Sequence, residues 1–401
     1  MPELRKAGKR RKASARGAFT RENDKRRFAP DHQPLGPDEA KTLLLPFIGS
    51  AQCILLAVSG GPDSVALMRL FSMVAKDCSG TELRAATVDH GLRENSRAEA
   101  EKVGTWARDC GVEHQVLRWK GRKPSTRIQE RARNARYALL DARARDIGAM
   151  LLVTAHTLDD QAETLLMRMA HGSGIAGLAG MRRVSERSGL HHARPFLSVP
   201  KARLLATCQA NGWEFVEDPS NEDPRFARAR WRRLAPALAR EGLTAARLAK
   251  LAERAATVEE ALRLKTEAAF AAACLEESAR SLALDMERIM RREPRELALR
   301  VLTLALNKIM GERPSPIRLE RAEGCLDALS TAFCARKPLK RTLGGALLDY
   351  DGAGCLRVRR EGARRRGRKF VQKGSKAAVP ARVRRAPQAN QSNSIALSTL
   401  V

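Results

Sequence analysis

The sequence lacks the features of membrane, secreted and redox proteins. No apolar run reaches the roughly 18 residues that a transmembrane helix needs, and the basic N-terminus has no apolar segment typical of a secretory signal. Eight cysteines are scattered without a CxxC pair, which disfavours zinc ribbons, iron–sulfur sites and dithiol redox centres. Dispersed free cysteines suit a reducing compartment. We therefore expect a cytoplasmic protein with no membrane partner.

Aromatic and acidic residues are also scarce. Aromatics make up 4% of the chain, which disfavours a protein that binds single strands by base stacking. The 74 Lys and Arg residues outnumber the 45 Asp and Glu residues and leave a net charge of +29. Residues 1–36 and 357–401 are the most basic parts, which predicts solvated tails. Because the middle is still basic, nucleic acid is the expected partner.

Short apolar runs at 53–58, 83–90, 113–119 and 149–156 alternate with segments of helical period. This alternation predicts an α/β fold with a doubly wound parallel sheet. Ligands of such sheets bind at the carboxyl ends of the strands, near the point where the strand order reverses. We therefore look for chemistry in the turns that follow these runs.

The chain beyond the sheet reads differently. Residues 227–310 are rich in Ala, Leu, Arg and Glu with helical period and almost no strand signal, which predicts a helical domain. A helix around 318–330 and a hairpin about Asp351-Gly352 follow. The expected segments are a basic disordered tail at 1–36, a nucleotide-binding catalytic domain at 37–225, a helical domain at 226–315, a short C-terminal α+β domain at 316–361 and a basic disordered tail at 362–401.

The turn after the first apolar run reads SGGPDS and comprises Ser59, Gly60, Gly61, Pro62, Asp63 and Ser64. It is neither a Walker A loop, since GK[ST] is absent, nor a Rossmann or hydrolase turn. The glycines let the backbone approach a ligand closely, and the proline suits the first turn of a helix. A helix N-terminus favours an anion, and the serines add hydroxyl donors. A capped turn with no ligand is the alternative.

Two further segments have weaker signals. Asp89 and His90 end the second apolar run, where a helix cap and an ordinary turn residue are the alternatives. In the helical segment 129–137, the spacing puts Arg133 on one face with its polar neighbours, and Arg136 is close in sequence. A solvated, salt-bridged helix face is the plainer interpretation of this segment.

Acidic residues cluster after the fourth apolar run, behind His156. Asp159 and Glu163 are four residues apart, so we expect both to face one way, with Asp160 beside them. Carboxylates near a phosphate loop can hold Mg²⁺ or grip a substrate amine. Acids at a helix N-terminus explain one or two of them, but not the cluster with the histidine. The glycine-rich loop 171–181 that follows is either a lid or a plain surface loop.

The chain contains, in this order, the motifs SGGxDS, VDHGLR, ExARxxRY, HxxDDQxET, GSGxxGLxGM, RP and DPSN. This series resembles the motifs of the tRNA(Ile)-lysidine synthases, which are PP-loop ATP pyrophosphatases. The resemblance spans about residues 54–240 and continues weakly to 361. It implies that ATP adenylates the C2 oxygen of cytidine 34 in the CAU anticodon of isoleucine tRNA. The amine of free L-lysine then displaces AMP and gives lysidine.

The resemblance also implies roles. The catalytic residues would be Asp63, Asp159, Asp160 and Arg133. The residues that bind ATP would be Ser59, Gly60, Gly61, Pro62, Asp63, Ser64, Asp89 and His90, with Asp63 as the Mg²⁺ ligand. The residues that bind lysine or tRNA would be His156, Asp159, Glu163, Arg136, Arg228, Arg230 and Arg232. Pro195 and the loop 218–221 would shape the entrance for the anticodon, and residues 316–361 would bind tRNA.

One position departs from the family pattern, because Ala229 stands where the pattern has Asn. A hydrogen bond is lost there, while the neighbouring arginines remain. A PP-loop enzyme that 2-thiolates tRNA is an alternative function, although such enzymes typically need paired cysteines. A non-catalytic RNA-binding protein is a further alternative. The oligomeric state stays open, with a homodimer as one option.

Overall fold

The structure is a computed structural model that describes residues 32–361, except residues 50, 79, 92–95, 122–127, 188, 218–222, 224 and 312–316. The DPSN loop at 218–221, the tail at 362–401 and most of the tail at 1–36 therefore lie outside the described residues. Within the described part, no helix is both long and apolar enough to cross a bilayer.

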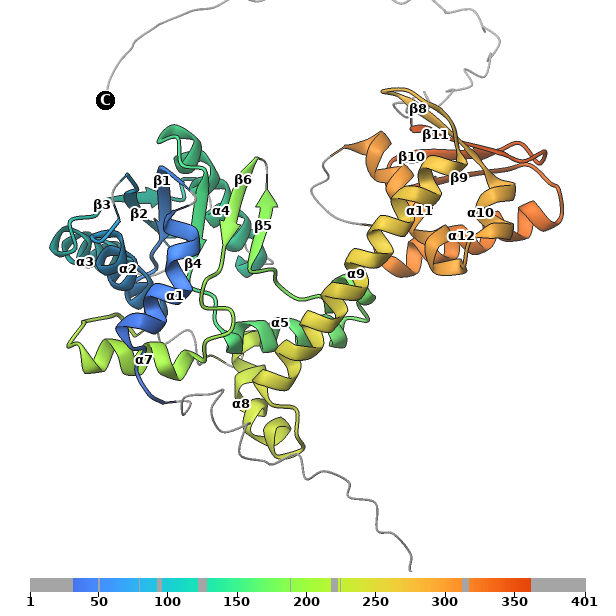
Figure 1. Ribbon diagram of the computed structural model, residues 1–401. Helices are drawn as coiled ribbons and strands as arrows, with labels where there is room; N and C mark the ends of the chain where they lie inside the picture. The colour runs from blue at the N-terminus through green and yellow to red at the C-terminus, as the bar shows by residue number, and fades with distance from the viewer. Residues whose placement is uncertain are drawn as a thin grey trace, which may run out of the picture.

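The first half of the chain forms a six-stranded sheet (Figure 1). Its order is β3 (Glu113–Arg118), β2 (Glu82–Asp89), β1 (Cys53–Ala57), β4 (Leu151–Thr154), β6 (Leu190–Ala193) and β5 (Val184–Arg187). All neighbours are parallel except β5 and β6. Successive strands from β1 to β3 extend the sheet in one direction, and β4 pairs with the other edge of β1. The strand order therefore reverses between β1 and β4, where a ligand is expected.

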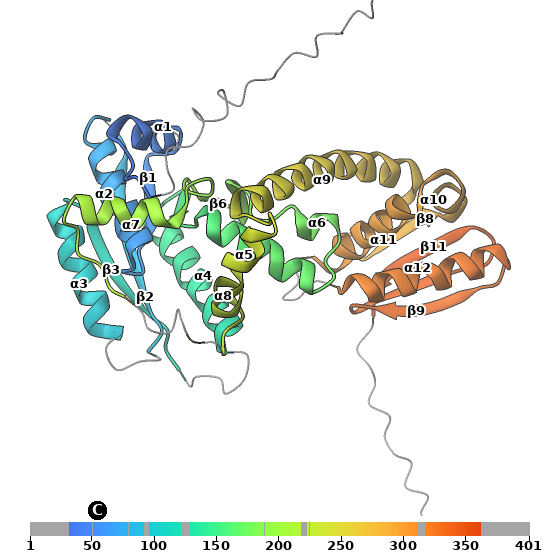
Figure 2. The same cartoon turned by 90° about the horizontal axis from the view of Figure 1, so that it is seen from below.

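Helices cover both faces of this sheet (Figure 2). One face carries α1 (Pro37–Ile48), α2 (Pro62–Ala75), α3 (Ser96–Asp109) and α7 (Lys201–Ala210), and the other carries α4 (Ile128–Asp146). The alternation of side chains along β1 explains this division. Ile54 and Leu56 join the core under α2, whereas Leu55 packs with Leu140 of α4. The predicted doubly wound sheet is confirmed.

A long helix joins the two halves of the molecule (Figure 1). After β4 come α5 (Leu158–Ala170), α6 (Ile175–Leu178), α8 (Ala227–Arg240) and the 29-residue α9 (Ala245–Ala273). Near its start, Leu248 and Ala252 of α9 pack on Leu165 of α5. Near its end, Ala269 and Phe270 belong to the core of the second half. One continuous helix therefore contacts both halves.

The second half contains a five-stranded antiparallel sheet in the order β7 (Cys274–Glu277), β8 (Ser281–Asp285), β11 (Cys355–Arg360), β10 (Ala346–Tyr350), β9 (Leu339–Leu343). Its helices are α10 (Met286–Arg292), α11 (Arg295–Met310) and α12 (Leu319–Cys334). The expectation of helices alone over 227–310 is wrong, because β7 and β8 lie within it. The helix near 318–330 and the hairpin of β10 and β11 are confirmed. The domain boundaries stay predictions, although a core shared by α11, α12 and this sheet argues against a boundary at 315.

Candidate active site

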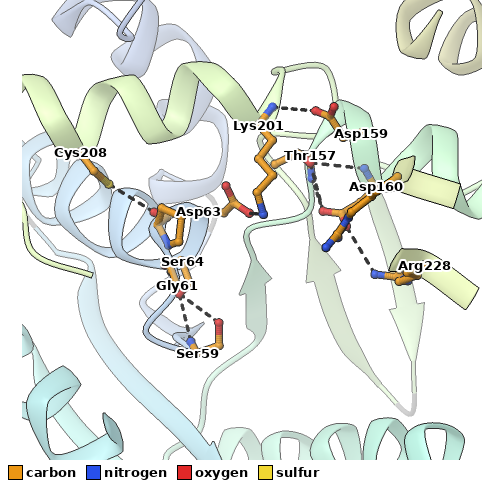
Figure 3. A network of polar contacts seen from close by, with 12 residues as sticks. Ser59, Gly61, Asp63, Ser64, Thr157, Asp159, Asp160, Lys201, Cys208 and Arg228 are labelled. Carbon is orange, nitrogen blue, oxygen red and sulfur yellow. Dashed lines mark hydrogen bonds and ion pairs between the residues drawn. The ribbon is translucent and has the colours of Figure 1, made fainter. Parts of the chain in front are cut away.

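The turn between β1 and α2 is held by the side chain of Ser64. Its buried Oγ accepts hydrogen bonds from the backbone N–H groups of Ser59 and Gly60, both at 3.1 Å, and donates to the carbonyl of Gly61 at 2.9 Å (Figure 3). Because that hydroxyl proton is donated within the turn, Ser64 shapes the loop. The backbone N–H groups of Gly61 and Asp63 donate to none of the described residues. These two groups are therefore available to an anion at the N-terminus of α2.

Gly60 is needed for the shape of this turn. Its φ of +91° lies in the region that L side chains rarely adopt, and a Cβ there would lie 3.2 Å from the Val103 side chain. Its carbonyl accepts a hydrogen bond from the backbone of Val216 at 2.8 Å. Glycine thus permits both the backbone conformation and the close packing behind the loop.

Asp63 lies in the first turn of α2 and faces the start of α7. Its Oδ2 lies 3.1 Å from Nζ of Lys201, while its Oδ1 is buried and has no hydrogen-bond partner among the described residues (Figure 3). Burial raises the pKa of Asp63 to about 6, although the Lys201 ammonium lowers it. An oxygen atom so placed can bind a cation without first breaking a protein contact.

The carboxylates of α5 have different partners, so Asp159 and Glu163 do not face one way as their spacing predicts. Asp159 accepts a hydrogen bond from the backbone N–H of Lys201 at 2.7 Å, which caps α7 (Figure 3). Asp160 caps its own helix, because its Oδ2 accepts a hydrogen bond from the backbone N–H of Thr157 at 3.0 Å. Glu163 instead faces α8. The pairing along α5 is therefore Asp160 with Glu163, three residues apart.

Two arginines of α8 face these two carboxylates. Nε of Arg232 donates to Oε1 of Glu163 at 2.6 Å, and Nη1 of Arg228 lies 3.4 Å from Oδ1 of Asp160. Burial raises the pKa of Glu163 despite this ion pair. Burial also opposes ionisation of Asp160, but the surrounding positive charges and the Thr157 amide lower its pKa below the ordinary value. The site therefore has a wall that offers both charge signs.

Arg230 is not part of this wall. Its exposed side chain donates to the carbonyl of Arg225 at 3.0 Å. The difference follows from helical period, because Arg228 and Arg232 are four residues apart and Arg230 lies between them on another face. Ala229, where the family pattern has Asn, is the buried residue of α8, with 3% of its surface exposed.

His156 and the arginines of α4 line another part of the site. Nδ1 of His156 lies 2.7 Å from Oγ1 of Thr154, and burial lowers the pKa of His156 far below its ordinary value, so the ring is neutral. Arg133 lies over the ring of Tyr137 at 5.2 Å. Arg136 keeps contact with solvent, and its pKa is lowered by desolvation and by the charges of Arg133 and Arg228. The positive charges of Arg133 and Arg228 also lower the pKa of His156.

Other predicted residues have mainly structural contacts. Oδ1 of Asp89 accepts hydrogen bonds from the Gly91 amide and the Ser96 hydroxyl, both at 2.8 Å, which close the turn after β2 and tie it to the first residue of α3. These bonds outweigh burial and lower the pKa of Asp89. The His90 ring packs edge-on against Trp119, and Pro195 is buried behind β6.

The glycine-rich loop after α5 is tied to that helix. Nη1 of Arg168 donates to the carbonyls of Gly177 and Gly180 at 2.7 and 3.0 Å, and Gln161 bonds both backbone groups of Met181. These contacts anchor the loop at several points. The lid interpretation stays a prediction.

Lys201 is the residue that sequence reasoning missed. The segment SVPKARLL begins α7 at Lys201, and neither a motif nor spacing connects it with Asp63, 138 positions earlier. A basic residue at a helix start interacts unfavourably with the helix dipole. This mismatch at Lys201 was the one sign in the sequence that the residue has a partner elsewhere. The structure explains the basic residue by the carboxylates around it.

The residues around Asp63 fit a nucleotide phosphate chain with Mg²⁺. Mg²⁺ is usually held by one or two carboxylates together with phosphate oxygens, and the unpartnered Oδ1 of Asp63 has the chemistry of such a ligand. The N-termini of α2, α5 and α7 converge here, and each favours negative charge. Two free backbone N–H groups and the Lys201 ammonium supply donors for phosphate oxygens.

Comparison with known proteins agrees with this geometry. A family model described as a PP-loop domain matches residues 38–238. A tRNA(Ile)-lysidine synthase from Methylobacterium nodulans is 51% identical over 330 residues, which cover 80% of this chain and 93% of the relative. One from Bradyrhizobium sp. is 45% identical and covers 79% and 92%. The solved U34-tRNA thiolase NcsA from Methanococcus maripaludis is 17% identical with a TM-score of 0.47, and the match covers 54% of this chain and 78% of that one.

Proposed function

The chain belongs to the tRNA(Ile)-lysidine synthases, and from that premise we propose how its residues carry out the reaction. The protein is an ATP-dependent ligase that forms lysidine in tRNA(Ile). We propose that lysine is joined to C2 of cytidine 34 in the CAU anticodon, after the C2 oxygen has been adenylated. The products are lysidine, AMP and pyrophosphate.

The need for ATP follows from the leaving group. The C2 oxygen of cytosine leaves poorly as oxide, whereas an adenylate leaves as AMP. In the first step the C2 oxygen attacks the α-phosphorus of ATP and pyrophosphate departs. In the second step the lysine amine attacks C2, the bond between C2 and the adenylate oxygen breaks, and the amine loses a proton. Both steps need cations near phosphate oxygens.

The phosphate chain would lie on the turn after β1. The backbone N–H groups of Gly61 and Asp63 would donate to phosphate oxygens, and Oδ1 of Asp63 would ligate Mg²⁺. When bound, Mg²⁺ neutralises charge on the phosphates. Lys201, whose ammonium already lies 3.1 Å from Asp63, would reach the same oxygens. Ser64 would keep the turn in shape.

The mixed-charge wall would bind lysine. Free lysine has two ammonium groups and one carboxylate, so it needs partners of both signs. Asp160 and Glu163 supply carboxylates, and Arg228 and Arg232 supply guanidinium groups, held together at 2.6 to 4.0 Å. Charge-assisted bonds of this kind are stronger than neutral ones. Arg133 and the rest of the predicted set remain candidates for tRNA or ATP contacts.

The observation that carries this proposal is the unpartnered, buried oxygen of Asp63 at the point where the strand order reverses. The test is ATP-dependent transfer of radioactive lysine to a CAU-anticodon transcript, with a transcript changed from C34 to U34 as control. Asp63→Ala and Asp160→Asn should abolish labelling, and asparagine at 160 keeps the helix cap. Asp109→Asn, an exposed carboxylate, is the matched control. Retained labelling in both variants would refute the assignment.

A second candidate function is 2-thiolation of tRNA, which uses the same kind of loop. It is less supported, because the curated relatives are named lysidine synthases. Replacing lysine with a sulfur donor in the same assay separates the two. Incorporation of sulfur without incorporation of lysine would favour the alternative.

A further inference from the structure

A chain of hydrogen bonds runs behind His156, away from the carboxylates. Nη2 of Arg194 lies 2.8 Å from Nδ1 of His192, and Nε2 of His192 lies 2.9 Å from Oγ1 of Thr154. The same Oγ1 lies 2.7 Å from Nδ1 of His156. Because β4 and β6 pair in parallel with Leu152 opposite His192, Thr154 and His192 share one face of the sheet. Arg194, His192 and Thr154 are buried.

The donor at the far end fixes the direction of the whole chain. An arginine side chain has no acceptor, so Arg194 donates and Nδ1 of His192 accepts. The ring proton of His192 is then on Nε2, and it donates to Oγ1 of Thr154. The hydroxyl proton of Thr154 is left to donate to Nδ1 of His156. His156 therefore carries its own proton on Nε2.

The opposite arrangement at the last bond is unfavourable. If Nδ1 of His156 were protonated, both histidines would donate to Oγ1 of Thr154. The hydroxyl proton of Thr154 would then have no acceptor among the described residues, and Thr154 is only 8% exposed. A buried donor without an acceptor costs free energy, so the chain favours one tautomer.

The other end of His156 is open. Among the described residues Nε2 of His156 has no hydrogen-bond partner, and the side chain keeps some contact with solvent. The ring is neutral, because burial lowers its pKa. A neutral ring with its proton on Nε2 donates one hydrogen bond and offers no acceptor to whatever lies before it.

We propose that Arg194, His192 and Thr154 are positioning residues that fix His156 as the Nε2-protonated tautomer, so that it donates a hydrogen bond to an oxygen atom of the substrate. This proposal deepens the proposed function and depends on it for the identity of the substrate. The acceptor is a phosphate or a carbonyl oxygen, and a proton acceptor role for His156 at Nε2 is excluded by the same chain.

The tautomer can be measured directly on the full chain. Selective ¹⁵N labelling of histidine gives seven residues, and two-bond correlations between ring protons and nitrogens distinguish the two neutral tautomers. The His156 and His192 signals are assigned by their loss in His156→Gln and His192→Gln. We expect both rings to be protonated at Nε2 and unprotonated at Nδ1. A proton on Nδ1 of His156 would overturn the proposal, whatever the enzyme's substrate.

Kinetics of three variants test the positioning role. Thr154→Val removes the hydroxyl group and should lower kcat/KM by about tenfold, the value of one hydrogen bond. Thr154→Ser keeps a hydroxyl group and should restore most of the activity. His191→Gln changes the exposed neighbour of His192 and should have no effect. A change in KM for ATP would indicate a phosphate acceptor, and a change in KM for tRNA or in kcat would indicate the carbonyl.

The outcomes separate the two proposals. If the unmodified protein does not transfer lysine, the proposed function fails. The tautomer measurement then still tests the direction of the hydrogen bonds from Arg194 to His156. If it transfers lysine and Thr154→Val has unchanged kinetics with His156 still protonated at Nε2, the positioning role of Thr154 is overturned.

Discussion

Replacing Asp63 with asparagine should stabilise the fold while it abolishes lysidine formation. Burial raises the pKa of Asp63 from 3.8 to about 6, and the side chain is 18% exposed, so solvent screens it little. Between these two pH values the folded protein binds a proton that the unfolded chain releases. The stability contributed by Asp63 is therefore present at low pH and lost as pH rises through about 6.

The magnitude follows from the shift in pKa. A difference of roughly two units at about 1.4 kcal/mol per unit gives about 3 kcal/mol at pH 7 and above. Asparagine has no charge at any pH and avoids this loss. The variant should therefore match the unmodified protein near pH 4 and exceed its free energy of unfolding by about 3 kcal/mol at pH 8. We therefore expect Asp63 to be kept for function even though its charge lowers the free energy of unfolding.

Urea unfolding followed by tryptophan fluorescence measures this difference, because Trp106 and Trp213 pack in the core of the same half. Asp77→Asn is the control. Its carboxylate pairs with Lys41 at the surface, and its pKa is lowered, so this variant should lose a little stability at high pH. A difference for Asp63→Asn that is equal at pH 4 and pH 8, or a less stable variant at pH 8, would refute the reasoning.

Three further perturbations have definite outcomes. Gly60→Ala should lower stability by about 1–3 kcal/mol because of its positive φ, and isothermal titration should show weaker ATP binding. Arg232→Met leaves the buried Glu163 carboxylate with only the longer contact to Arg228 at 4.0 Å, so KM for lysine should rise about tenfold, whereas Arg230→Met should change it little. Deleting 362–401, which removes ten basic residues and no acidic ones, should raise KM for tRNA and flatten its salt dependence; unchanged tRNA kinetics would contradict this.

The site on β1 was predictable because its signals are local. A turn and a helix start are determined there by a strand end followed by two glycines, a proline and an acidic residue. Pro62 begins α2 as expected. The order of the motifs then indicated the chemistry. The partners of each carboxylate were not predictable, because Asp159 is turned toward α7 by a helix start 42 residues away. Helical spacing alone put it beside Glu163.

The strands β7 and β8 show a similar failure for a different reason. Ala, Leu and Glu dominate residues 269–285 and favour helix locally. β8 becomes a strand because it pairs with β11, whose residues come about seventy positions later, and Leu282 and Leu284 are buried by that pairing. Tertiary packing overrides a modest helical preference, and no local pattern reports it.

The length of the single helix α9 sets the distance between the two halves of the protein. Its 29 residues correspond to about 43 Å of rigid rod, with Leu248 packed on α5 and Phe270 in the core of the other half. If the RNA substrate contacts both halves, the separation of those contacts is set by the number of residues in one helix. Adding four residues to α9 would lengthen the rod by about 6 Å and turn one half against the other by about 40°. An RNA of fixed shape that contacts both halves could then bind to one half or to the other, but not to both at once.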